Sequence, residues 1–351
     1  MGSKLRIAVV ANANSIHTIR WVKWLRKNEL EVTIFSLNEG EDCVYFGPEP
    51  ALDRSLIFNL GKNVRKTTSE LQTKIDEFKP DLVHGFFLIN HGMYASRIKG
   101  YPKINTAMGS DVLIAPEESK LLSWIVKRTI KNSDSVFGPP LLLNKIKEWK
   151  LETELNENVI GINNSVFKPA EKTKSIVFAR GFKEVYNPLI VAKAFESLAK
   201  QLENFNFVLC GDGPLKTESE RILSYCRNVQ FTGQISEIEL AKIVGSAQLV
   251  ISPSLSDSIP LTILEAVASG TPVVASNIPA NREWVERELP VFLFETESSE
   301  DLAEKILKVI GDDSILKNTL ESGPKLVKEK YSWEKEAEKV LKKYQDIVTQ
   351  K

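Results

Sequence analysis

Short apolar runs alternate with amphipathic stretches along most of this chain. Apolar runs of this kind are typical of buried strands, and amphipathic stretches are typical of helices that cover a sheet. Their alternation predicts an α/β protein with parallel sheets covered on both faces. In the first half we expect strands at 5–11, 32–35, 81–84, 104–107, 135–137 and 159–160, and helices at 18–27, 69–78 and 120–132.

The second half of the chain restarts the same pattern after a polar stretch, 163–174, that contains Pro169. Two such series predict two Rossmann-like, doubly wound domains, 1–165 and 170–331, followed by a terminal helix within 332–351. Ligands of such sheets bind at the carboxyl ends of the strands, so facing halves would place a cleft between them. The expected strands are 176–179, 207–210, 229–231, 249–251, 272–275 and 291–293, and the expected helices include 188–201 and 215–225.

Composition narrows the class of protein. A chain of 351 residues is long enough for two domains, and its 46 basic and 46 acidic residues balance, so net charge predicts no nucleic-acid partner. Cys43, Cys210 and Cys226 are few and dispersed, which favours reduced thiols in a cytoplasmic protein. We find neither a signal-peptide pattern nor an apolar stretch long enough to span a membrane.

The run 254–276 is the most informative segment for function. It predicts a loop carrying Asp257, a helix carrying Glu265, and then a buried strand. A loop that leads into a helix presents free backbone N–H groups and a positive dipole end, which suit a phosphate, and flanking acids can accept hydrogen bonds from sugar hydroxyls. This combination predicts a nucleotide-sugar pocket. The alternative for Glu265 is structural, because Thr262 and Glu265 have the spacing of a capping box.

The same run resembles the signature of the retaining glycosyltransferases of the GT-B fold, family 4, also called glycosyl transferases group 1. Residues 264–275 match closely, whereas Asp257 replaces the first Glu of the signature and Pro260, which has no N–H, stands where many members have Gly. The resemblance implies a C-terminal domain that binds the donor and an N-terminal domain that binds the acceptor. It also implies that the terminal helix packs back on the N-terminal domain.

Arg180 directly follows the first strand of the second half and matches the Arg of this family. A departing diphosphate gains charge as the glycosidic bond breaks, so a fixed cation at this point would stabilise it. The Lys that family members carry about five residues later is absent, since Val185 and Tyr186 stand there. Lys183 could supply a second charge, and the alternative is that it is a solvated surface residue.

The resemblance assigns further residues to the donor. Gly211 and Gly233 belong to turns that follow strands, although the glycines could serve the turns alone. Asn14 and Ser15 take the place of a Gly-Gly pair that approaches the diphosphate, and Ser15 could instead be only a helix N-cap. Around the two acids and Arg180, the residues expected to line the sugar-phosphate region are Ser258, Ile259, Leu261 and Thr262.

His17, His84 and Asp111 are the candidate acceptor-binding residues. The alternatives are a surface or capping role for His17, a hydrogen-bonded structural role for His84, and a loop-capping role for Asp111. Phe86 replaces a second His that orients the donor sugar in some relatives. The histidines lack zinc-site spacing and no Asp-x-Asp pair ends a strand, so we expect no metal and no cofactor beyond the nucleotide-sugar substrate.

The resulting hypothesis is a metal-independent hexosyltransferase that moves a sugar from a nucleoside diphosphate, UDP or GDP, to an acceptor hydroxyl with retention, in polysaccharide or glycoconjugate biosynthesis. Partners would be the donor and a sugar, polysaccharide or lipid-linked acceptor. The amphipathic stretch 120–131 would allow peripheral contact with the inner face of a membrane, and the alternative is an ordinary domain helix. The rival functions are a nucleotide-sugar epimerase on the same architecture and a non-catalytic nucleotide-sugar-binding protein.

Overall fold

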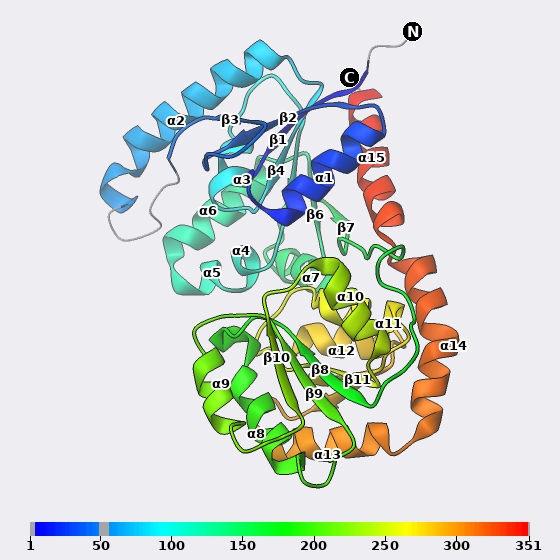
Figure 1. The fold of residues 1–351 in the computed structure, drawn as a ribbon. Helices are drawn as coiled ribbons and strands as arrows, with labels where there is room; N and C mark the ends of the chain where they lie inside the picture. The colour runs from blue at the N-terminus through cyan, green and yellow to red at the C-terminus, as the bar shows by residue number, and fades with distance from the viewer. Residues whose placement is uncertain (1–3, 49–55, 350–351) are drawn as a thin grey trace. The chain divides into compact units, whose positions relative to one another are not determined.

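The computed structural model describes residues 4–48 and 56–349, without the side chains of 56–62. The chain divides into two compact units, Met1–Val159 with Ala337–Lys351 and Ile160–Glu336, which we call unit 1 and unit 2 (Figure 1). Each unit is built on a parallel sheet flanked by helices. The expected α/β class with two Rossmann-like sheets is confirmed.

Unit 1 contains a seven-stranded sheet in the order β3-β2-β1-β4-β5-β6-β7. The order reverses between β1 and β4, whose register pairs Val9 with His84. Loops that follow these two strands therefore lie at the topological switch point of the sheet. The strands are β1 (Arg6–Val10), β2 (Glu31–Ser36), β3 (Cys43–Tyr45), β4 (Leu82–Phe86), β5 (Lys103–Thr106), β6 (Ser135–Gly138) and β7 (Glu154–Glu157).

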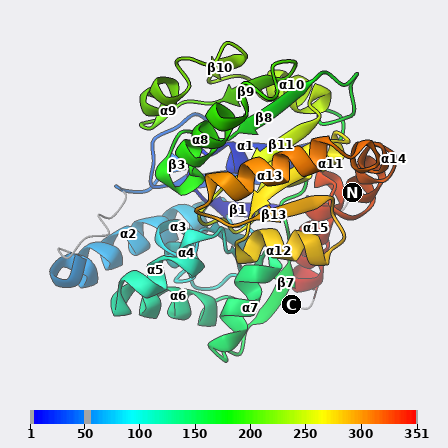
Figure 2. The same cartoon turned by 90° about the horizontal axis from the view of Figure 1, so that it is seen from below.

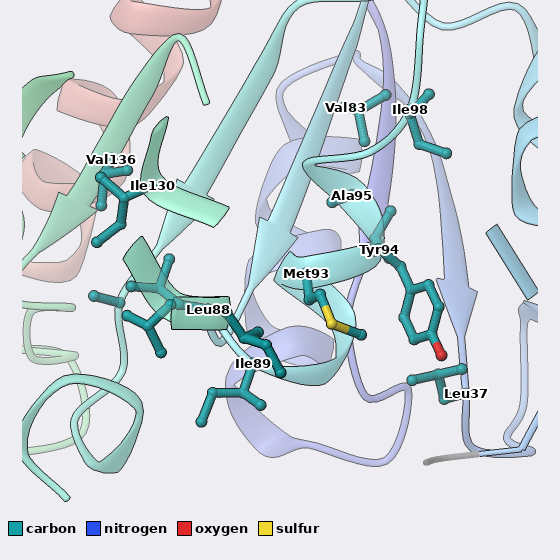
Figure 3. Packing of buried hydrophobic residues seen from close by; sticks show 14 of the residues in the cluster. Leu37, Val83, Leu88, Ile89, Met93, Tyr94, Ala95, Ile98, Ile130 and Val136 are labelled. Carbon is teal, nitrogen blue, oxygen red and sulfur yellow. The ribbon is translucent and has the colours of Figure 1, made fainter. Parts of the chain in front are cut away.

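Helices cover both faces of this sheet. On one face, buried Val83 packs in a core with Met93 of α3 and Ile130 of α6 (Figure 3). On the other face, Trp21 of α1 meets Tyr344 of α15 edge to face, with ring centroids 6.4 Å apart. The helices of unit 1 are α1 (Ile16–Lys27), α2 (Leu56–Phe78), α3 (Asn90–Ala95), α4 (Ser110–Leu113), α5 (Ala115–Glu118), α6 (Lys120–Lys131), α7 (Pro140–Glu148) and α15 (Trp333–Thr349).

Unit 2 contains a six-stranded sheet in the order β10-β9-β8-β11-β12-β13, which reverses between β8 and β11. Phe178 and Phe207 lie in the core that α8 and α13 cover, and Figure 2 shows these helices side by side. The strands are β8 (Ser175–Ala179), β9 (Asn206–Cys210), β10 (Val229–Gly233), β11 (Leu249–Ser252), β12 (Val273–Ser276) and β13 (Val291–Phe294). The helices are η1 (Glu184–Tyr186), α8 (Pro188–Leu198), α9 (Lys216–Ile222), α10 (Glu237–Ser246), α11 (Leu261–Ala268), α12 (Pro279–Glu286), α13 (Ser299–Ile310) and α14 (Asp313–Lys330).

One predicted strand is wrong. Residues 159–160 are not a strand, because Ile160 has φ 68° and Gly161 has φ 76°, which no extended strand allows. This segment instead enters unit 2, where Ile162 pairs with Ser332 in an isolated parallel bridge. A Cβ on Gly161 would lie 2.8 Å from the Ser332 carbonyl oxygen, so the close approach of the two segments requires glycine.

Candidate functional site in unit 2

The strand order of unit 2 places its candidate site at the reversal point. Arg180 is the first residue after β8, and Asp257 lies in the loop after β11. These two strands are neighbours, and both loops leave the same edge of the sheet because the strands are parallel. Arg180 and Asp257, which are 77 residues apart in the sequence, thus lie together at the edge where open α/β sheets bind ligands.

The guanidinium of Arg180 is held by several groups. One terminal nitrogen donates to Asp257 Oδ2 at 2.6 Å, and the other donates to Thr262 Oγ1 at 3.3 Å. Its central carbon lies 4.2 Å from the centroid of the Tyr186 ring. The Arg180 and Asp257 side chains are only 14% and 12% exposed. A planar cation gripped in this way has a fixed orientation, as recognition of phosphate oxygens requires.

The Asp257 carboxylate positions the Arg180 side chain. Its second oxygen, Oδ1, accepts from the backbone N–H groups of Ser258 at 2.8 Å and Ile259 at 3.2 Å. Those two N–H groups therefore serve the carboxylate in this structure. The loop that leads into α11 is therefore held by hydrogen bonds to the Asp257 carboxylate, which also bonds to Arg180.

Helix α11 begins beside Arg180, at Leu261. The N–H of Leu261 donates to the Ile259 carbonyl and that of Ile263 donates to the Pro260 carbonyl, whereas among the described residues the N–H of Thr262 meets no acceptor. A free N–H at a helix start, together with the helix dipole, favours an anion. Within the described part of the chain, Nε of Arg180 is likewise buried without a partner.

The capping-box interpretation of Glu265 is wrong. Pro260, not Thr262, is the N-cap of α11, and Thr262 is already the second helical residue. Glu265 therefore lies in the second turn of the helix, beyond the position that a capping box uses. Its side chain is half-buried. The assignment of Glu265 to the ribose stays a prediction.

The glycine-containing turn after β9 packs directly against the Arg180 loop. Gly211 has φ 113°, and a Cβ at this position would lie 2.7 Å from the Arg180 carbonyl oxygen. Its N–H donates to the Gly233 carbonyl at 2.8 Å, and the Phe182 N–H donates to the Asp212 carbonyl at 3.0 Å. Glycine is required here for both the dihedral angle and the close approach. Lys183 in the same loop is exposed.

In unit 1, the loop after β1 carries the other predicted donor residues. Asn14 is exposed, and its side-chain amide donates to the Glu39 carbonyl at 2.9 Å. Ser15 is the N-cap residue of α1, as the alternative predicted, although its hydroxyl accepts no hydrogen bond from a helical N–H. His17 is half-buried, and its pKa is lowered by loss of hydration and by the nearby charge of Arg20. The donor and acceptor roles of these residues stay predictions.

Two of the predicted acceptor residues are buried, which corrects their assignment. His84 is 1% exposed, and its ring nitrogens bond to the Tyr344 hydroxyl and, at 2.8 Å, to Thr106 Oγ1. Asp111 is fully buried, and its carboxylate accepts from the N–H groups of Leu88, Met108 and Gly109. Asp111 organises loops at the carboxyl edge of the sheet, whereas His84 links β4 to β5 and α15, and neither side chain is exposed to bind an acceptor.

Comparison with known proteins agrees with this architecture. The family described as glycosyl transferases group 1 matches residues 161–326, and the family described as glycosyl transferase 4-like matches residues 6–138. Together the two matches identify the chain as a glycosyltransferase. This enzyme is 27% identical over 300 residues to the uncharacterized glycosyltransferase MJ1178 of Methanocaldococcus jannaschii, covering 83% of this chain and 79% of the relative.

Solved structures show that this glycosyltransferase has the GT-B fold, as expected. Sucrose-phosphate synthase from Thermosynechococcus elongatus superposes with a TM-score of 0.79 at 17% identity, over 99% of this chain and 100% of that one. HepE from Anabaena, in complex with UDP and glucose, superposes with a TM-score of 0.75 at 14% identity, over 97% and 99% of the two chains.

The sequence interpretation missed the contact that Tyr186 makes in this glycosyltransferase. Tyr186 was noted only because it replaces a family Lys, yet its ring supports the Arg180 guanidinium. The available signal was an aromatic residue six positions after an arginine at the end of a strand.

Among the described residues, no helix has the length and apolarity to cross a membrane. Among the same residues, no cluster of three or more His, Cys, Asp or Glu side chains is arranged to hold a metal ion.

Proposed function

We propose that this glycosyltransferase transfers a hexosyl unit from a nucleoside-diphosphate sugar to an acceptor hydroxyl, with retention of configuration and without a metal ion. The observation that carries the proposal is the fixed Arg180 guanidinium at the start of α11, paired with Asp257. A cation and a helix N-terminus at the switch point of a doubly wound sheet form a diphosphate site.

In the proposed reaction the acceptor hydroxyl oxygen bonds to the anomeric carbon of the donor sugar. The bond from that carbon to the diphosphate oxygen breaks on the same face, and the departing phosphate oxygen takes the acceptor proton. Arg180 and the N–H of Thr262 would stabilise the charge that develops on the phosphate. This role would replace the divalent cation that other diphosphate-dependent enzymes use.

Two considerations support a nucleotide sugar as the donor. The family is one of glycosyltransferases, and a protein of the same fold, HepE, has been solved with UDP and glucose. Glu265 follows Thr262 by three positions on α11, so the two residues lie on neighbouring turns of one helix face. A carboxylate there would accept hydrogen bonds from the ribose hydroxyls of a nucleotide whose diphosphate meets the helix start.

A thermal-shift screen with UDP-, GDP- and ADP-sugars tests the donor. We expect one nucleotide class to raise the melting temperature by roughly 5–10 °C at 100 times its Kd, from about 2.7 kcal/mol of binding free energy. Glu265→Ala should lose most of this rise, because the ribose contact disappears. The matched control is Glu304→Ala on α13, an exposed acid of the same unit, which should respond as the wild type does.

An equal rise in wild type and Glu265→Ala would remove Glu265 from the pocket. No rise with any of the three nucleotide classes would contradict the nucleotide-sugar donor. Product formed from the donor alone, without an acceptor, would identify an epimerase, and binding without turnover with any acceptor would identify a non-catalytic binder.

A further inference from the structure

Unit 1 contains a cavity of about 860 Å³ that the proposed reaction does not use. It is formed by α2, the segment after α3, the start of β5 and α6. Because it includes the first residue of β5, it lies at the amino edge of the sheet, whereas Asn14 and His17 follow the carboxyl end of β1. The cavity is thus separate from the predicted donor and acceptor residues.

All charged side chains that line the cavity are positive. The residues around it include five cations and no carboxylate. Among the described residues, none of these cations forms an ion pair. The cations are Arg65, Arg97, Lys99, Lys103 and Arg128.

The nearby acids are engaged by neutral donors. Asp76 accepts from Gln72 at 2.9 Å and from the Tyr101 hydroxyl at 3.0 Å, and Asp134 accepts from the backbone N–H of Lys103 at 2.7 Å. Burial first, and the charge of Arg128 in addition, lower the pKa of Arg97. The two guanidiniums therefore repel each other across the cavity, which costs folding free energy that a bound anion would offset.

The cations are held by anchored segments. Arg97 donates to the Met93 carbonyl at 2.8 Å, and the Arg128 guanidinium lies 5.5 Å from the Trp124 ring centroid. Ile98 directly follows Arg97 in the sequence and Ile130 follows Arg128 by two positions, and both are buried in the core together with Met93 (Figure 3). The backbone that presents the positive charges is fixed by packing, so the cavity is preorganised for a ligand.

We propose that this cavity binds a ligand bearing two or more phosphate groups, through Arg97, Arg128 and Lys103. A phosphate monoester carries about −1.5 to −2 charge at pH 7, so five cations match two to three phosphates. Arginine forks and an ammonium are the side chains that bind phosphate oxygens best. The hydroxyl of Ser69 and the amide of Asn132 line the same cavity and add neutral donors.

Calorimetric titration with inorganic pyrophosphate at about 0.15 M ionic strength tests the proposal, since this salt screens weak surface contacts. Arg97→Gln with Arg128→Gln should weaken binding at this cavity by at least tenfold, because two charge-assisted contacts are lost. The control is Lys120→Gln with Lys131→Gln, which removes the same charge from exposed sites on α6 outside the cavity and should bind as the wild type does. A second variant, Arg65→Gln with Lys99→Gln, alters only exposed cavity residues. It provides the same test of the cavity charge if the first variant does not fold.

Hydrogen exchange separates this site from the proposed donor site. Pyrophosphate bound in the cavity should protect residues 96–103, whereas protection of 257–263 reports the Arg180 site. Vesicles of phosphatidylcholine with and without a phosphatidylinositol bisphosphate form a second arm. Cavity-dependent binding of pyrophosphate indicates a soluble phosphorylated ligand, and cavity-dependent binding only of the acidic vesicles indicates a phospholipid headgroup. Absence of both, or equal weakening in the control, overturns the proposal without affecting the donor site.

Discussion

Arg180→Ala is expected to lower kcat by about 10²–10³-fold, which is the usual loss when one donor to a developing anion is removed. The guanidinium is oriented by Asp257 and Tyr186 before any ligand arrives, so its charge is available to the leaving diphosphate without rearrangement. Removal of the side chain leaves only the helix start to stabilise that charge. Initial rates at saturating donor, once the thermal-shift screen has identified it, measure the effect.

Two arginine variants control for charge and for general damage. Arg180→Lys retains a cation but loses the planar fork, so at least a tenfold loss of kcat is expected to remain. Arg221→Ala removes an arginine that is 77% exposed on the helix after β9, and should leave kcat unchanged. If Arg180→Ala is folded and its kcat stays within about threefold of wild type, Arg180 does not act on the transition state.

The sequence was sufficient to predict the organisation of unit 2 and the neighbourhood of its site. Buried parallel strands read as continuous apolar runs, so β8 and β11 were found, and the residues after them were assigned to one sheet edge. The Arg180–Asp257 pair follows from that topology. The contact with Thr262 does not, because it depends on where α11 begins, and Pro260 shifts that start relative to the capping-box pattern.

Unit 1 was harder to predict from local pattern. The edge strands β3 and β7 are short and only partly buried, so they have no apolar run to reveal them. His84 lies on β4, and its polar side chain is covered by Tyr344, a residue 260 positions away in the sequence. Local sequence could not indicate that α15 would cover this face. The acceptor assignment of His84 failed for that reason.

Acidification should destabilise unit 1 by about 3 kcal/mol between pH 6.5 and pH 5, because two buried histidines cannot take up protons there. Burial lowers the pKa of His84 to about 3 and that of His91 to about 4. Histidines of an unfolded chain bind protons near pH 6.5, so well below that pH these two rings hold two more protons in the unfolded state than in the folded state. Each contributes about 1.36 kcal/mol per pH unit, and stability rises with pH over this interval.

The hydrogen bonds explain why both rings stay neutral. Trp21 Nε1 donates to the Tyr344 hydroxyl at 3.3 Å, and the same hydroxyl shares a hydrogen bond with Nδ1 of His84. Nε2 of His91 accepts from the Leu37 N–H at 3.2 Å. A proton added to Nε2 of His91 would place two donors face to face, and a charged His84 ring would have to lose its hydration in a site without water access.

Denaturant titrations at pH 5, 6 and 7, followed by hydrogen exchange of β1 and β4 amides, measure the slope of unit 1 stability against pH. His91→Gln keeps an acceptor for the Leu37 N–H but does not titrate, and His84→Asn does the same toward Tyr344, so each should reduce the slope by about 1.36 kcal/mol per pH unit. Burial raises the pKa of Asp111, so that group acts with the opposite sign and is common to all variants. If both variants keep the wild-type slope, the two histidines accept protons in the folded state. In that case the contact of Trp21, Tyr344 and His84, which joins α15 to the sheet, does not depend on a neutral imidazole.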